Sequence, residues 1–304
     1  MPFFFSDKRC QFPKGRIQLQ TAYPFYEPGN TVTGVIYIEI MEAVEASHIE
    51  LEIKGGEKCS FIRHYTTQDG DRTVHHADKL KHSKKFLEYK NRVFDIQGGV
   101  LNPGIYQVDF QTELPHHIPS SLHFKHKHSR EEPKAKVKYY VKATLHTHHK
   151  HDEMKFKQVL IIREKPVNMV VGDAQSETSH IKTWCCIDQG TSTMSSVFAK
   201  NVFLPNEIAE GHVKVNNEHC QLNANRVSFY VEQVLTVHAG GHSHTYRNRL
   251  VNQTVEGPHA GVADWQTPMS VDLSKIRYEV VGQKKKKGVM KEVSPEDRFM
   301  MAGV

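Results

Sequence analysis

The sequence of 304 residues lacks any apolar run near the roughly 18 residues that a membrane-spanning helix needs. Its amino terminus, MPFFFSDKRC, has neither a long apolar segment nor a small-residue cleavage site, so we expect no secretory signal. Cysteine is scarce, and the five residues form an odd, scattered set. This usage argues against a disulfide framework and favours a reducing, cytoplasmic compartment.

The sequence also lacks the short motifs that carry common enzyme chemistry. It contains no nucleophile elbow, no glycine-rich phosphate loop and no HExxH zinc motif. The glycine pair Gly98-Gly99 precedes an expected strand rather than opening a helix, so it cannot cradle a phosphate as a P-loop does. We therefore expect no catalytic residue, no bound cofactor and no enzyme activity.

Positive charge exceeds negative charge only slightly in this sequence. Forty Lys and Arg residues against 34 Asp and Glu residues give a net charge of +6 with histidine neutral, and there are 21 histidines besides. Such an excess suits acidic partners, for example phosphorylated tails or anionic lipid head groups at a membrane surface. Because no RNA- or DNA-binding motif accompanies the charge, we expect no nucleic-acid partner.

What the sequence does contain is apolar alternation with the period of two that marks half-buried antiparallel strands. The clearest such segments are residues 17–25, 31–40, 49–54, 106–111, 136–145 and 156–162. Gly34 falls on the apolar face of its segment, which predicts a bulge or a close backbone approach there. The polar residues 63–92 show little periodicity, and Asp69-Gly70-Asp71 predicts a hairpin turn within them.

The most distinctive passage is GGVLNPGIYQVDFQTELPHHIPSSLHF, residues 98–124. Its Pro-Gly pair predicts a turn, and Tyr106, Val108 and Phe110 share one face of the strand that follows. The later Leu-Pro and Ile-Pro pairs interrupt strand pairing, because proline has no donor for the ladder. Together with the earlier Y-x-PGN-x-V-x-G-V and I-x-L-x-I-K-G-G runs, this passage resembles the amino-terminal domain of arrestins.

A weaker resemblance to the arrestin carboxy-terminal domain follows, carried by Cys-x-x-x-Gly at 186–190 and F-L-P-N-E-x at 203–208. The resemblance implies an all-β fold of two arrestin-type, immunoglobulin-like β-sandwiches in tandem. We expect the amino-terminal sandwich over residues 1–165, a connector over 166–179 and the carboxy-terminal sandwich over 180–304.

We expect the second sandwich to be incomplete. After residue 184 the sequence offers about five strand candidates, fewer than the roughly seven that a sandwich of this type uses. The last clear candidate is Ile276–Val281, and the lysine run at 284–287 that follows shows no alternation. The PPxY motifs through which alpha-arrestins recruit ubiquitin ligases do not occur in this sequence, which has no Pro-Pro pair.

By resemblance, the function is that of a non-enzymatic trafficking adaptor. Such a protein binds cytosolic regions of membrane proteins and links them to endocytic sorting or ubiquitination machinery, through exposed strands, grooves and charge complementarity. The resemblance implies a cytoplasmic protein that is recruited to the plasma membrane or endosomes. Two alternatives stay open: a retromer-type arrestin-like coat subunit, and a His-rich metal- or anion-binding β-sandwich.

Basic residues are the candidates for contacts with an acidic tail. Arrestins that read phosphorylated receptors use basic side chains near the first strand, where this sequence has Lys14 and Arg16. Lys136 and Lys138 alternate along the polar face of a predicted strand. A strand edge that is charged to prevent aggregation would account for these lysines equally well.

The histidines suggest a metal site less strongly than their number implies. His126 with His128, and His146 with His148, are two residues apart and could each share one strand face. A tetrahedral site needs further ligands and an outer shell of supporting groups, and the sequence shows no Cys/His spacing of a structural zinc site. We therefore predict no metal site, and in particular no zinc site in the turn over residues 146–151.

Overall fold

The computed structural model describes residues 8–126, 129–165, 168–184 and 186–276. The chain divides into two compact units, one of residues 1–165 with 237–244 and the other of residues 166–236 with 245–302. Within the described ranges the regular structure consists of antiparallel strands and four 3₁₀ helices of three residues each. The predicted all-β fold is confirmed. No helix in these ranges is long and apolar enough to cross a membrane.

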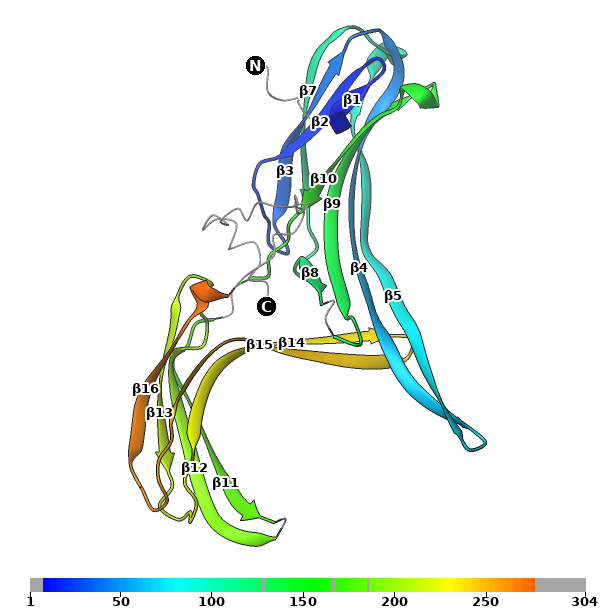
Figure 1. Ribbon diagram of the computed structural model, residues 1–304. Helices are drawn as coiled ribbons and strands as arrows, with labels where there is room; N and C mark the ends of the chain where they lie inside the picture. The colour runs from blue at the N-terminus through cyan, green and yellow to red at the C-terminus, as the bar shows by residue number, and fades with distance from the viewer. Residues whose placement is uncertain (1–7, 127–128, 166–167, 185, 277–304) are drawn as a thin grey trace. The chain divides into compact units, whose positions relative to one another are not determined.

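The first unit consists of two antiparallel sheets (Figure 1). One has the strand order β1 (Gln11–Phe12), β2 (Gly15–Thr21), β3 (Thr31–Ile40), β7 (Gly104–Glu113). The other has the order β10 (Met154–Leu160), β9 (Lys134–Thr147), β4 (Val44–Asp69), β5 (Arg72–Asp95), with β6 (Val100–Leu101) paired to β4 and β8 (Leu122–Lys125) paired to β9. Short 3₁₀ helices, η1 (Lys8–Cys10), η2 (Gln97–Gly99) and η3 (Lys150–Asp152), lie between strands.

Both sheets contribute to a single hydrophobic core in this unit. Ile36 of β3 and Val108 of β7 belong to the same buried cluster as Leu51 of β4 and Val141 of β9. Because successive side chains on a strand point to opposite faces, each alternating segment of the sequence places one apolar face in this core. The arrangement is a β-sandwich, as the resemblance to arrestins implies.

The passage over residues 98–124 lies as predicted in two respects and differs in a third. Val108 and Phe110 are buried, and no regular strand forms between Glu113 and Leu122, where the two prolines fall. Tyr106 shares their face and packs against the core but is only partly buried, and its hydroxyl donates a hydrogen bond to the carbonyl of Asn102, 2.8 Å away.

The hairpin of β4 and β5 is much longer than the sequence indicated. Its ladder runs from the pair His48–Asp95 to the pair Asp69–Arg72, and Gly70 begins the predicted turn with a φ of 59°. Nearly all side chains between residues 66 and 85 are exposed on both faces of the ribbon. Without a buried face the segment shows no apolar alternation, so the pattern could not reveal the strand.

In the second unit a four-stranded sheet accompanies a two-stranded hairpin (Figure 1). The sheet has the order β11 (Val171–Thr183), β12 (Ile187–Lys200), β13 (Ile208–Asn216), β16 (Trp265–Asp272); the hairpin pairs β14 (Arg226–Ala239) with β15 (His242–Glu256), and η4 (Leu273–Lys275) follows β16. Val213 of β13 and Met269 of β16 share a buried cluster with Val227 of β14, so the hairpin covers one face of the sheet.

The sequence analysis made two predictions for this unit, a connector over residues 166–179 and a last strand at Ile276–Val281. Most of the connector expected over 166–179 is strand β11, which pairs with β12 from Val171–Lys200 to Thr183–Ile187. Its polar side chains are exposed, and hydroxyl pairs such as Thr178–Thr193, 2.8 Å apart, replace the apolar alternation that would have marked a strand. The strand candidate Ile276–Val281 lies outside the described residues beyond Ile276, so the number of strands in the second sandwich stays a prediction.

Candidate functional site: the basic outer face of the amino-terminal sheet

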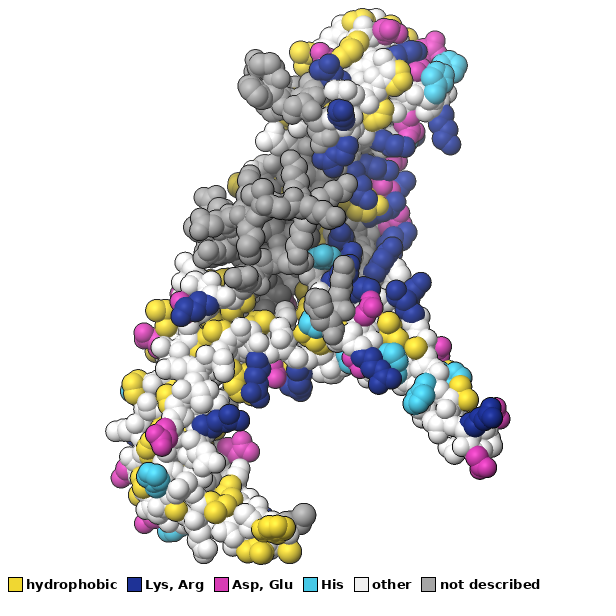
Figure 2. Space-filling model, in the orientation of Figure 1, with side chains coloured by type: hydrophobic (Ala, Val, Ile, Leu, Met, Phe, Trp, Pro, Cys, Tyr) yellow, Lys and Arg dark blue, Asp and Glu magenta, His cyan; other side chains and the backbone are white. Residues whose placement is uncertain are grey.

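Lysines gather on the outer face of the sheet β10-β9-β4-β5 in the first unit (Figure 2). Odd-numbered residues of β9 such as Tyr139 and Val141 fill the core, so the even-numbered ones point outward. Residues directly opposite one another in an antiparallel ladder share a face, which extends the outward set to the neighbouring strands. The lysines of this basic face are Lys54, Lys58, Lys81, Lys85, Lys90, Lys125, Lys134, Lys136, Lys138, Lys142, Lys155 and Lys157.

One buried carboxylate lies among these lysines. Glu52 of β4 is 1% exposed and stands between Lys142 of β9 and Lys90 of β5 in the ladder. The Lys142 Nζ lies 2.8 Å from the Glu52 Oε2, and the Lys54 Nζ lies 2.5 Å from the Oε1. Burial opposes ionisation of Glu52, but hydrogen bonds from Lys142 and Lys54 outweigh it and lower its pKa to about 2. The carboxylate is therefore charged at neutral pH and neutralises the middle of the face.

Two lysines near Glu52, Lys54 and Lys157, also contact other groups of the sheet. Lys54 also lies 3.0 Å from the Glu88 carboxylate of β5, and the hydrogen bonds to Glu52 and Glu88 raise its pKa. The Lys157 ammonium lies 3.3 Å from the centre of the Tyr140 ring, a cation–π contact. Burial first, and then the charge of Lys142, lower the pKa of Lys157. These lysines are engaged with groups of the sheet itself.

Lys136 and Lys138, predicted as contacts for an acidic tail, lie together in the outer part of the same face. Lys136 stands opposite Lys58 of β4, and Lys138 stands opposite Gly56. Within the residues that the structure describes, neither Lys136 nor Lys138 forms an ion pair. They are cations of the face that no carboxylate of the described chain neutralises.

Lys14 and Arg16, the other two predicted contacts, do not join this group. Arg16 belongs to β2 of the other sheet, where its guanidinium lies 3.5 Å from the carboxylate of Glu39. The Lys14 ammonium hydrogen-bonds the buried carboxylate of Asp152, 2.7 Å away, and this bond raises the pKa of Lys14. Both cations therefore have acidic partners within the unit.

Sequence reasoning missed several lysines of the face. Lys90 lies in the segment without periodicity, and Lys58 and Lys157 belong to strands whose register against β9 no local pattern reveals. The alternation of lysines from Lys134 to Lys142 was the only signal available. This alternation identifies the lysines of β9 but not those of the neighbouring strands β4, β5 and β10.

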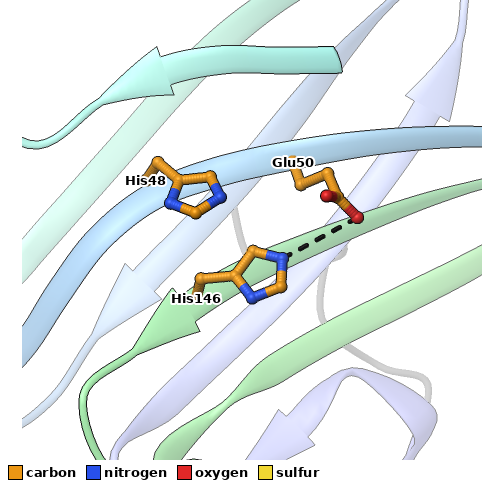
Figure 3. Close-up of side chains that lie close together, drawn as sticks. All are labelled: His48, Glu50 and His146. Atoms are coloured by element: carbon orange, nitrogen blue, oxygen red, sulfur yellow. Dashed lines mark ion pairs between the residues drawn. The ribbon is translucent and has the colours of Figure 1, made fainter. Parts of the chain in front are cut away.

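The two histidine pairs named from the sequence were not expected to bind a metal, and only one of them lies wholly within the described residues. His128 lies outside the described residues, and His148 lies past the end of β9, where its ring is 3.6 Å from the carboxylate of Glu45. His146 instead stacks on His48 of β4, with ring centroids 4.6 Å apart, and Glu50 lies beside them (Figure 3). Two residues separated by almost a hundred positions are brought together by the β4–β9 ladder.

Comparison with protein families matches residues 15–168 to the model described as "Arrestin (or S-antigen), N-terminal domain". This span is slightly more than half of the chain and includes every strand of the first unit from β2 to β10.

Two curated relatives extend the similarity further along the chain. Arrestin domain-containing protein A of Dictyostelium discoideum is 25% identical over 248 residues, which cover 80% of this chain and 42% of that protein. Arrestin domain-containing protein 17 of Caenorhabditis elegans is 24% identical over 260 residues, which cover 79% of this chain and 57% of that protein. The chain therefore spans about half the length of the curated relatives that it matches.

Proposed function

Because the chain belongs to the arrestin family, we propose that it is a non-enzymatic trafficking adaptor that binds acidic cytosolic regions of membrane proteins. It links them to endocytic sorting or ubiquitination machinery, and it works in the cytoplasm, from which cargo recruits it to the plasma membrane or endosomes. In this proposal residues 1–165 and 180–304 form two arrestin-type sandwiches, of which the second is incomplete.

The observation that carries the proposal is the outer part of the basic face. Lys136, Lys138 and Lys58 lie side by side on β9 and β4, and no ion pair within the described residues occupies them. Isolated exposed charges contribute little to stability, so this row of cations has no evident structural task. It offers several ammonium groups to a peptide whose carboxylates or phosphates can reach them together.

The middle of the face limits where such a peptide binds. Glu52 and Glu88 neutralise Lys54 and Lys142, so an acidic peptide gains less there than beside Lys136. We therefore place the acidic groups of the partner over Lys58, Lys136 and Lys138.

A direct test measures the affinity of a synthetic peptide with several phosphoserines for the chain and for the double variant Lys136→Glu/Lys138→Glu. Reversing these two outward-facing charges should weaken binding about tenfold, which corresponds to about 1.4 kcal/mol. Binding should also weaken as salt rises from low to about 0.15 M, where exposed charges are screened over about 8 Å.

The matched control is Lys182→Glu/Lys214→Glu, which changes the net charge equally on exposed positions of β11 and β13. This control should bind the peptide as the unaltered chain does. An affinity that is indifferent to salt and to both double variants would contradict the proposal and indicate an apolar groove. Purification from cells then separates the adaptor from the coat-subunit alternative, because ubiquitin ligases support the first and retromer partners the second.

A further inference from the structure

Three side chains of metal-ligating type meet on the outer face of the first unit, at the end of the β4–β9 ladder (Figure 3). His48 and His146 are directly opposite one another, and Glu50 lies two residues beyond His48 on the same face of β4. One ligand atom from each of the three lies within 4.8 Å of the other two. The group is assembled by the fold from distant parts of the sequence.

One ring nitrogen of His48 has a hydrogen-bonding group beside it. The His48 Nδ1 lies 2.8 Å from the hydroxyl of Ser47, whereas the His146 Nδ1 lies 3.8 Å from the carboxylate of Glu153, which is too far for a hydrogen bond. Metal-ligating histidines use this arrangement, in which one nitrogen binds the ion and the other contacts a hydroxyl or carboxylate that fixes the ring.

The other nitrogen of His146 lacks a satisfactory partner. The His146 Nε2 is buried and has no hydrogen-bond partner among the described residues, and its nearest acidic atom is the Glu50 Oε1, 3.8 Å away. A buried polar atom without a partner costs free energy. The gap between this nitrogen and the carboxylate is too long for a hydrogen bond. A cation bound to both atoms would satisfy them together.

The surrounding charges both favour and oppose a cation. The positive charge of Arg92 acts on His48 and opposes a bound cation. Glu153 and Asp95 contribute negative charge near the two rings. Against this, the Lys90 ammonium lies 3.6 Å from the Glu50 carboxylate and competes for it. An affinity in the micromolar range is the expected result.

We propose that His48, Glu50 and His146 form a binding site for a divalent transition-metal cation, with Zn²⁺ as the best-fitting ion. Two imidazoles and one carboxylate match the nitrogen and oxygen ligands of zinc, whereas calcium and magnesium prefer oxygen alone. A water molecule would complete the four-coordinate geometry. Ligand atoms of a tetrahedral site with bonds of about 2.0–2.1 Å lie roughly 3.3 Å apart. The ligand atoms must therefore approach one another by up to about 1.5 Å, and all three side chains are partly exposed.

The proposal departs from the sequence prediction that the chain has no metal site, and of the histidines in the turn over residues 146–151 it uses His146 without His148, His149 or His151. It does not depend on the proposed adaptor function. A bound ion would cross-link β4 and β9 and so stabilise the first unit, by an amount that rises with the logarithm of the free ion concentration above its Kd.

The test is titration calorimetry of the full chain, free of any affinity tag, with zinc chloride at neutral pH in a weakly coordinating buffer. One saturable site should appear, and the double variant His48→Ala/His146→Ala should weaken its affinity at least tenfold. The matched control His148→Ala/His149→Ala also removes two histidines, from exposed positions beyond the strand, and should retain the site.

A second measurement guards against a variant that fails to fold. Glu50→Gln keeps the shape of the side chain and removes the charge, so it should fold and bind zinc more weakly. Zinc should raise the unfolding temperature of the unaltered chain and of the control, and raise it less in Glu50→Gln. Equal zinc affinity in the unaltered chain, the cluster variants and the control would overturn the proposal and assign the binding to scattered histidines.

Discussion

Gly34 of β3 lies directly opposite Phe110 of β7, and the phenyl ring occupies the space in which a side chain at position 34 would begin. A Cβ atom at this position would lie 2.6 Å from the Cζ of the ring and 2.3 Å from the carbonyl oxygen of Gln20 on β2. Groups of both neighbouring strands, β7 and β2, therefore lie in the space that a side chain at position 34 of β3 would need. The close backbone approach that the sequence predicts at Gly34 is confirmed.

The Phe110 ring is a principal part of the first core, and its removal should be costly. Phe110 is 5% exposed and belongs to the same buried cluster as Ile36 and Leu51 of the two sheets. Phe110→Ala should lower the free energy of unfolding by about 3–5 kcal/mol, because the lost transfer energy and the remaining cavity both contribute. Denaturant unfolding of the unaltered and variant chains measures the difference.

Gln111→Ala is the control, since the neighbouring side chain on β7 is exposed and its loss should change stability by about 0.5 kcal/mol or less. If Phe110→Ala lowers the free energy of unfolding by less than about 1 kcal/mol, the Phe110 ring does not contribute substantially to the stability of this core.

Glu52 should make the stability of the first unit depend on pH in the acid range. Its folded pKa of about 2 lies below the ordinary value of 4.5. The lowered pKa therefore stabilises the fold fully above pH 4.5, and this contribution is lost as the pH falls toward 2. Glu52→Gln should cost about 1.5–3 kcal/mol at neutral pH, since hydrogen bonds between charged groups are lost. Urea unfolding at several pH values measures both effects.

The difference in stability between the unaltered chain and Glu52→Gln should shrink as the pH falls between 4.5 and 2. Glu45→Gln is a matched control on the same strand, because the Glu45 side chain is 60% exposed. It should stay within about 0.5 kcal/mol of the unaltered chain. If the difference in unfolding free energy between the two chains instead stays constant from pH 4.5 to 2, the interaction of the lysines with the charged form of Glu52 does not stabilise the fold.

The sequence predicts those parts of the fold in which one face of a strand is buried. The segment 31–40 is a strand with the predicted bounds, and the turn at Gly70 joins two strands as expected. Strand β11 and the outer half of β5 escaped prediction, because exposure of both faces leaves no alternation to detect. Strand β15 alternates between exposed and partly buried side chains, but polar residues such as Asn248 and Gln253 occupy partly buried positions, so its sequence shows no clear apolar period.

The candidate sites were predictable only where they follow one strand. The lysines of β9 alternate in the sequence, so Lys136 and Lys138 could be named before the structure was known. The meeting of His48 with His146 depends on the register between β4 and β9, which includes an irregularity between Ala46 and His48. A register shift of one residue exchanges the two faces of a strand, so no local pattern specifies such a pair.

The second unit should be less stable to local opening than the first. Among the described residues, one buried cluster of the first unit contains 26 residues, whereas two buried clusters of the second unit contain four residues each. Strand β11 adds an edge whose side chains are almost all exposed, so little apolar contact holds it beyond its ladder with β12. Opening of such elements requires less free energy than global unfolding.

Hydrogen exchange followed by mass spectrometry on the full chain measures this difference directly. Amides of residues 184–276 should exchange faster than those of residues 17–162, and the fastest strand amides should be those of β11 that face away from β12. Phe229 and Val231 of β14 are only partly buried against the second core, so this unit should also promote self-association as concentration rises. Equal protection of the two segments in a chain that stays monomeric would contradict the argument, because it would require the smaller clusters to resist opening as well as the larger core does.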